Sequence, residues 1–302
     1  MIRKFGKQYL FVIVIVINCI YGALSFHLLG QTIHIAYTAN LNCNLEACNC
    51  GDNDLGGMVQ LANIIDALRD SFPDLLLIDS GDFLKTYPLE DANRLMIEMI
   101  YTIKYDAIGL GEQEYVDGED FLMKEIEKYP LSLISTNIRC NVKESNYFQS
   151  YKILPVDTLS IGIVSIIRPE CFDFIRRPEI EILPEENEIE KFLALHQDRL
   201  DLIILLLHGS YREGLKVAEK YPEISIIICG HTQEKYEKKL ENQIVLQSGV
   251  DGEFLGFLKI VRDNMKIDFQ NKFIPVNDTH GKNATFQEKV DEYFQRFEND
   301  AN

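Results

Sequence analysis

Leu-Leu-Leu-Ile-Asp-Ser-Gly-Asp, at residues 75–82, is the stretch that decides the fold. Four large apolar residues run directly into Asp79, and Gly81 and Asp82 follow. An apolar run this short, ended by glycine and acids, is typical of a buried strand in a parallel sheet. An open α/β sheet places its binding crevice at the carboxyl ends of such strands. Asp82 is therefore a candidate ligand-binding residue, although a helix cap or turn would explain one such carboxylate equally well.

Three further strand-like runs end in a polar residue beside a glycine: 107–110 before Glu112, 202–207 before His208, and 224–229 before His231. Equivalent ends of parallel strands lie at one edge of a sheet, so we expect these three residues and Asp82 to converge. Glycine suits tight turns and close backbone approach. Two imidazoles and two carboxylates form an O/N site for a divalent metal, and we expect zinc, manganese or iron.

The rest of the chain alternates between helical and strand-like patterns. Apolar residues at helical spacing predict helices over 57–72, 91–104, 121–128, 185–200 and 286–297, and apolar runs predict strands over 33–37, 131–134 and 161–167. His196 shares the apolar face of one of these helices, which favours a helix-surface or core-edge position over a ligand. From residue 244 onward three strand-like runs follow one another. The sum indicates one α/β domain with a more antiparallel C-terminal part.

Length and charge limit the class of protein. The chain has 302 residues and a formal net charge of -17. Its length suits one large domain or two small ones. The negative charge argues against nucleic acid as a partner, because a nucleic-acid-binding protein needs a basic surface to release counterions.

Residues 1–25 have the layout of a secretory signal peptide. Arg3, Lys4 and Lys7 precede an apolar run over 10–20, and small residues follow near 23–25. We therefore expect an exported protein, periplasmic or extracellular. An uncleaved N-terminal anchor is the alternative, and only then would the protein contact a membrane. The globular domain is expected over 26–279, and residues 280–302 are expected to form a C-terminal helix packed on it.

The order of the polar motifs resembles that of the calcineurin-like metallophosphoesterases, in particular the N-terminal catalytic domain of periplasmic, UshA-like 5′-nucleotidases. That family uses D-x-H, G-D, G-N-H-E, a single H after an apolar strand, and G-H-T-H. The corresponding residues are Asn40-Leu41-Asn42, Gly81-Asp82, Gly111-Glu112-Gln113-Glu114, His208, and Gly230-His231-Thr232-Gln233. The likeness spans roughly residues 33–275. It implies a single-domain, four-layer α/β/β/α sandwich.

The resemblance implies that one metal position is kept. In the family two metals share the aspartate that aligns with Asp82. One of these metals also binds the residues that align with Glu112, His208 and His231. All three side chains can ligate a metal, and the glutamate is a stronger anionic ligand than the family's asparagine.

The resemblance also implies that a second metal position is vacated. The family's other metal binds the residues that align with Asn40, Asn42 and Gln233, and these amides lack a charged or imidazole donor. We therefore expect one divalent metal ion rather than two. The family's catalytic histidine aligns with Gln113, whose amide cannot serve as a general acid.

Cys48 and Cys50 form a C-x-C pair in the loop after the first motif. This pair resembles a divergent branch of exported proteins, the UshA-like (seleno)proteins, which carry C-x-C or C-x-U there. Two such thiols can bind one soft metal or act in redox chemistry, and Cys43 is near enough in sequence to join them. We expect the pair beside the vacated position, forming a hybrid centre. Incidental cysteines, or disulfides to Cys140 or Cys171, are the alternatives.

Two functions remain open from the sequence. The first is a metal-dependent hydrolase with weak or altered activity on the phosphoester bond of a small phosphorylated molecule. The second is a non-hydrolytic protein in which the C-x-C loop binds metal or exchanges electrons with an exported redox protein. Of these two functions we favour the hydrolase. We expect its activity to be much reduced, because the site lacks several of the family's residues.

Overall fold

The computed structural model describes residues 31–47, 54–140, 148–175, 177, 180–263 and 266–300. The expected signal peptide or anchor at 1–25 lies outside these residues, as do Cys48 and Cys50. The predictions made for them stay predictions. Within the described part, no helix is both long and apolar enough to cross a membrane.

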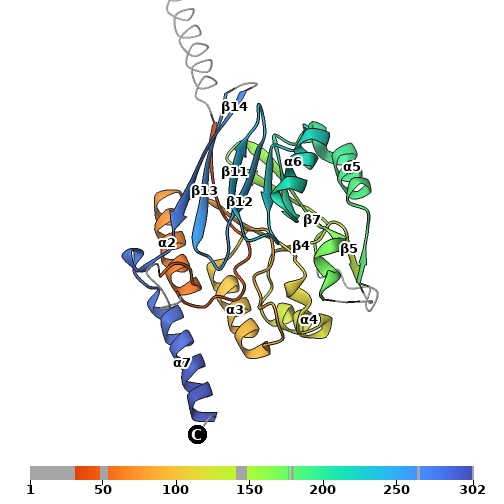
Figure 1. Ribbon diagram of the computed structural model, residues 1–302. Helices are drawn as coiled ribbons and strands as arrows, with labels where there is room; N and C mark the ends of the chain where they lie inside the picture. Colours follow the sequence, from red (N-terminus) through yellow and green to blue (C-terminus); the bar gives the residue numbers. More distant parts are fainter. Residues whose placement is uncertain are drawn as a thin grey trace, which may run out of the picture.

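Two six-stranded mixed sheets form the centre of the molecule (Figure 1). The first has the order β14 (Lys266–Pro275), β13 (Phe254–Asp263), β1 (Gln31–Thr38), β2 (Leu76–Asp79), β3 (Ala107–Gly109) and β4 (Leu133–Ile134). The second has the order β11 (Lys235–Lys239), β12 (Ile244–Ser248), β10 (Ile226–Cys229), β9 (Leu202–His208), β7 (Leu159–Ile167) and β6 (Lys152–Val156). A two-stranded ribbon pairs β5 (Ile138–Cys140) with β8 (Ile180–Ile182).

The strands next to the predicted site are parallel within each sheet. β1, β2, β3 and β4 run parallel in the first sheet, and β7, β9, β10 and β12 do so in the second. Antiparallel strands complete the edges, with β13 and β14 on one sheet and β6 and β11 on the other. The parallel core places the carboxyl ends of β2, β3, β9 and β10 in one region.

Helices cover the outer faces of both sheets (Figure 1). The helices are α2 (Met58–Ser71), α3 (Glu90–Ile103), α4 (Glu119–Lys128), α5 (Glu185–His196), α6 (Tyr211–Lys220) and α7 (Ala284–Asp300). Short 3-10 turns lie at η1 (Gln113–Tyr115), η2 (Pro169–Asp173), η3 (Gln197–Arg199) and η4 (Asp278–His280). α6 begins directly after β9 because Ser210 caps it, accepting from the Glu213 backbone N–H in a capping box.

The period of two along the strands determines the layers. In β9, Leu202, Ile204 and Leu206 pack between the two sheets. The alternate residues, Ile203, Leu205 and Leu207, pack with residues of α5 and α6. α2, α3, α4 and α7 join a separate cluster on the outer face of the first sheet. The expected α/β/β/α sandwich is therefore confirmed.

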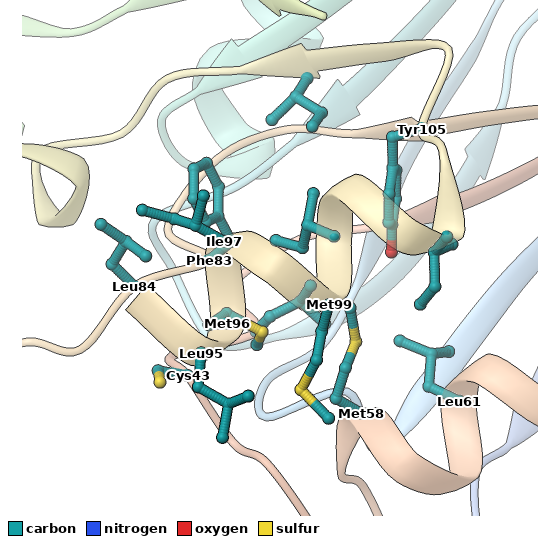
Figure 2. Packing of buried hydrophobic residues seen from close by; sticks show 14 of the residues in the cluster. Cys43, Met58, Leu61, Phe83, Leu84, Leu95, Met96, Ile97, Met99 and Tyr105 are labelled. Atoms are coloured by element: carbon teal, nitrogen blue, oxygen red, sulfur yellow. The ribbon is translucent and has the colours of Figure 1, made fainter. Parts of the chain in front are cut away.

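Buried apolar side chains pack α3 against α2 on the first sheet. Met99 of α3 lies beside Met58 of α2, and Met96 lies near Leu95 and Cys43 (Figure 2). These side chains and Leu61 of α2 are buried in one apolar cluster. Cys43 lies in the same apolar cluster, where its Sγ donates to the Ala92 carbonyl oxygen at 3.3 Å. The idea that Cys43 joins a metal centre is therefore wrong, because this thiol packs under a helix.

α7 packs its apolar face against α2 and α3. Phe286 and Val290 are buried in the same cluster, and the Lys289 Nζ lies 2.6 Å from Glu98 Oε1 of α3.

Replacing Phe286 by alanine should lower the free energy of unfolding by about 3–5 kcal/mol, because it leaves a cavity under the helix. Phe294 is 46% exposed, so Phe294→Ala should change it by less than about 0.5 kcal/mol. Urea denaturation of both variants measures this, and equal small effects would show that α7 does not stabilise the domain.

Candidate metal centre

The four side chains expected at the strand ends do come together. Asp82 follows β2, Glu112 follows β3, His208 is the last residue of β9, and His231 follows β10. The His208 Nε2 lies 2.9 Å from Glu112 Oε2 and 3.4 Å from Asp82 Oδ2. The His231 Nδ1 lies 3.1 Å from Glu112 Oε1. One carboxylate therefore bridges the two imidazoles, and Asp82 lies on the side of His208.

His208 is held in one tautomer. Its Nδ1 lies 2.9 Å from the backbone oxygen of Ser80, and a carbonyl oxygen can only accept, so Nδ1 carries the proton. A neutral ring then directs the lone pair of Nε2 at the two carboxylates of Asp82 and Glu112. That arrangement is repulsive unless Nε2 holds a proton or a metal ion. A histidine that ligates a metal through one nitrogen commonly donates the other N–H to a backbone carbonyl in this way.

In the metal-free chain, the charged side chains of the cluster shift one another's pKa values. Burial lowers the pKa of His208, but the carboxylates of Asp82 and Glu112 outweigh it, and the pKa lies well above its usual value. Burial acts to raise the pKa of Glu112, but hydrogen bonds from His208 and His231 lower it to about 2. These shifts favour positive charge on the imidazoles beside the Glu112 carboxylate, and a divalent cation could supply that charge instead of protons.

Cys171 joins these residues from η2. Its thiol is buried, and its Sγ approaches the His208 backbone oxygen at 3.5 Å. Donor atoms of Glu112, Cys171, His208 and His231 all lie within 4.8 Å of one another. The contact with Cys171, followed by the hydrogen bond to Glu112, raises the pKa of His231 to about 10. Cys171 is free rather than bridged, so the disulfide alternative does not hold for this residue.

Glycines allow the backbone to close around His208. A Cβ on Gly111 would lie 2.2 Å from Asp82 Oδ1, and a Cβ on Gly230 would lie 2.8 Å from His208 Nδ1. Neither distance is compatible with a side chain. The sequence analysis expected such close backbone approach from the glycine beside each polar residue.

Glu114 fixes the two loops that carry Asp82 and Glu112. It is fully buried, and its carboxylate accepts four backbone N–H groups, from Gly111 at 2.6 Å and from Asp82, Phe83 and Leu84 at 3.0, 2.8 and 3.3 Å. Asp82 has a φ of +62°, a left-handed conformation that costs energy for a residue with a side chain. Glu114 is thus a positioning residue, and the sequence analysis missed this role.

Asn40 and Asn42, which the resemblance aligns with a second metal position, form hydrogen bonds to neighbouring loops. The Asn40 Nδ2 donates to the backbone oxygens of Thr232 and Gly249, at 2.9 and 3.0 Å. The Asn42 Nδ2 donates to Asp251 Oδ1 at 2.8 Å. These amides tie three loops together, and their Oδ1 atoms have no partner among the described residues. Neutral amide oxygens remain there, and they are weaker ligands than carboxylate or imidazole.

Gln113 and Gln233 lie in different surroundings. The Gln113 Nε2 donates to Asp82 Oδ2 at 2.9 Å, and its backbone N–H donates to Asp82 Oδ1 at 3.2 Å. Gln113 therefore orients the Asp82 carboxylate. Gln233 is exposed and forms none of the hydrogen bonds found among the described residues near the centre. His196, which was not expected to be a ligand, lies in α5 with its ring 4.6 Å from that of Tyr151.

The side chains present fit a divalent cation on two grounds. The donors are imidazole, carboxylate and thiol groups, the common ligands of zinc and iron. The second ground is charge, because Asp79, Asp82, Glu112 and Glu114 are all buried at this edge. Across the described residues, no lysine or arginine forms an ion pair with any of these four acids. Only the imidazoles of His208 and His231 contact them as possible cations, and buried charge is costly unless it is paired.

Cys171 is a site residue that the sequence pattern does not predict. The apolar run over 161–167 predicts a strand, but this run does not end in a polar residue beside a glycine as the runs before Asp82, Glu112, His208 and His231 do. β7 pairs parallel with β9 with Ile167 opposite His208, so the residues after Ile167 leave the sheet at the same edge. The parallel pairing of β7 with β9 is the feature that predicts a position for Cys171 near this edge. The turn that folds Cys171 back over His208 is not evident from the pattern.

Comparison with known proteins identifies the fold. No family model matches the chain. It is 27% identical over 226 residues to a snake venom 5′-nucleotidase of Naja atra, covering 66% of this chain and 40% of the relative. It is 25% identical over 275 residues to a 5′-nucleotidase of Homo sapiens, covering 76% and 46%. The structure of a 5′-nucleotidase precursor from Thermus thermophilus superposes with a TM-score of 0.80 at 18% identity, covering 88% of this chain and 59% of the other.

These matches define what the chain shares with known proteins. It has the metallophosphoesterase fold, and 5′-nucleotidases are its homologues at about 25% identity. The chain spans less than half the length of these curated relatives. The narrower likeness to UshA-like (seleno)proteins stays a prediction, because it depends on the loop with Cys48 and Cys50.

Replacing Glu114 by glutamine should destabilise the metal-free protein by at least about 2 kcal/mol. The amide NH2 cannot accept, so buried backbone N–H groups lose their partner at about 1–3 kcal/mol each. Glu241→Gln, on an exposed turn, is the matched control. Burial, with the charge of Asp82, raises the pKa of Glu114 to about 8 despite its backbone hydrogen bonds. Urea midpoints are therefore compared at about pH 9, above this pKa, where the carboxylate is ionised and accepts. An unchanged midpoint at that pH would contradict the role of Glu114 as an acceptor.

Proposed function

We propose that this chain is a metal-dependent hydrolase of the metallophosphoesterase type, acting at a low rate on a small phosphorylated molecule. One divalent metal would be held at Asp82, Glu112, His208 and His231. The observation that carries the proposal is the orientation of the His208 ring, whose Nδ1 lies 2.9 Å from the Ser80 carbonyl oxygen and whose Nε2 faces two carboxylates. A cation held there would supply Lewis-acid polarisation of a phosphoryl oxygen.

The surrounding residues account for a low rate. Gln113 orients Asp82 through two hydrogen bonds but has no titratable proton to give to a leaving group. Asn40 and Asn42 use their amide nitrogens to join loops. The half-exposed His231 is the member of the cluster most accessible from solvent. A substrate would therefore approach from the His231 side.

A non-hydrolytic metal or thiol protein is the second candidate function. The specific observation in its favour is the thiol of Cys171 inside the cluster, since a fourth protein ligand leaves less room for a substrate oxygen. In this case the partner would be an exported redox protein rather than a phosphoester.

Metal content tests the site directly. Asp82→Ala, His208→Ala and His231→Ala should each lose most of the metal bound by the wild-type chain, because each removes a donor or a charge beside it. His196→Ala and His280→Ala should keep it, because His196 lies among aromatic rings and His280 lies in η4. Elemental analysis of dialysed protein measures this. Equal retention in all five variants would place the metal elsewhere.

AMP hydrolysis by the zinc- or manganese-loaded chain should be about 100- to 1000-fold slower than by a 5′-nucleotidase, because an electrostatic stabiliser is missing. Gln113→His should raise the rate if the site is hydrolytic, and Gln197→His on the far surface turn should not. Phosphate release is the measurement. Turnover at an ordinary enzyme rate would refute the low-rate argument, and no metal-dependent hydrolysis in either protein would favour the second function.

A further inference from the structure

We infer that Cys171 supplies a thiolate ligand that closes the metal centre around a four-coordinate cation such as Zn²⁺, together with Glu112, His208 and His231. This inference rests on the metal binding proposed above but not on hydrolysis. It concerns which metal the centre selects and how many positions it leaves open.

The backbone positions Cys171 for this role. β7 ends at Ile167 beside the end of β9, and the Arg168 N–H donates to the His208 carbonyl oxygen at 3.0 Å. The Cys171 N–H then donates to the Arg168 carbonyl oxygen at 3.1 Å, which forms the turn of η2. These two bonds bring the thiol back over His208. The loop is thus tied to the strand that carries a predicted ligand.

The spacing of the donor atoms suits a tetrahedral site. Zinc binds sulfur at about 2.3 Å and nitrogen or oxygen at about 2.0 Å, so neighbouring ligand atoms lie about 3.3–3.5 Å apart. One donor atom from each of the four residues lies within 4.8 Å of the others. The two imidazoles already contact the Glu112 carboxylate, His208 Nε2 at 2.9 Å from Oε2 and His231 Nδ1 at 3.1 Å from Oε1. Small side-chain adjustments would bring all four to bonding distance.

Comparison with Cys43 separates a ligand from an ordinary core cysteine. Both thiols are buried, and burial raises the pKa of Cys43 to about 12 in an apolar cluster with one carbonyl partner. Cys171 borders the same apolar cluster, but its Sγ also lies near two imidazoles and a carboxylate. A cation there would stabilise its thiolate, whereas at Cys43 burial outweighs the opposing effect of Lys85.

The ligand set determines selectivity. A thiolate favours zinc or iron over magnesium, manganese and calcium, which prefer oxygen ligands. Four protein ligands also characterise closed zinc sites, whereas catalytic sites keep an open position. With two anionic ligands and Asp82 beside them, the centre would retain its metal strongly and polarise a substrate weakly. This would reinforce the low rate expected from Gln113.

Cobalt substitution gives a direct readout. The metal-free full-length chain is titrated with Co²⁺ under reducing, anaerobic conditions, and the near-ultraviolet sulfur-to-cobalt charge-transfer band is recorded. The wild type should show the band, and Zn²⁺ should remove it by displacement. Cys171→Ser should abolish the band and weaken zinc binding at least about 10-fold, since even an outer-shell partner contributes that much. Affinity for Mn²⁺ should change less.

Three further variants make the outcome decisive. Cys43→Ser should keep the band, because that thiol lies in the core. Cys171→His restores a fourth donor, so it should bind zinc without the sulfur band even if Cys171→Ser folds poorly. A band that survives in Cys171→Ser and disappears in Cys48→Ser/Cys50→Ser would overturn the inference and assign the sulfur to the C-x-C pair. If the wild type binds cobalt without the band, the inference about Cys171 is wrong and the proposed function is untouched. If the wild type binds no metal, the proposed function is wrong as well.

Discussion

The concentration of buried carboxyl groups at one edge of the two sheets is the constraint on which the site depends. Asp79, Asp82, Glu112 and Glu114 are buried there, and within the described residues only His208 and His231 form ion pairs with any of them. Burial raises the pKa of Asp79 to about 6, although the hydrogen bonds that it accepts from Thr38 and Gly81 act to lower it. Removing an ion from water costs several kcal/mol, and only close positive charge offsets it. Protons on two imidazoles supply this in the metal-free chain, and a divalent cation would do so more completely.

The same constraint explains why the loops are held so firmly. Glu114 gathers backbone N–H groups from two loops, and Asn40 and Asn42 join the first-motif loop to distant segments. Several residues in these loops adopt left-handed backbone conformations, Asp82 and His231 among them. Such conformations persist only where the surroundings enforce them, and they are common at functional sites. These loops thus hold Asp82 and His231 beside Glu112 and His208.

Much of this arrangement could be predicted from the sequence. Apolar runs that end in Gly-Asp, Gly-Glu or His-Gly identify buried parallel strands, and parallel strands bring their carboxyl ends together. Asp82, Glu112, His208 and His231 follow from that rule alone. Edge strands were harder, because β11 reads Lys-Tyr-Glu-Lys-Lys and resembles an exposed loop. Charged residues on an edge strand discourage pairing with other chains, which is why its sequence lacks a strand signal. The role of Cys171 depends on a turn, and that of Glu114 on backbone donors, neither of which has a periodic pattern.

Anomalous diffraction from crystals of the full-length chain grown with zinc would test the central claim most directly. We expect one strong peak between the side chains of Glu112, His208 and His231, at bonding distance from His208 Nε2. The same peak should be missing from crystals of His208→Ala. A wild-type crystal with no peak at this position, while zinc is bound elsewhere in the molecule, would contradict the account.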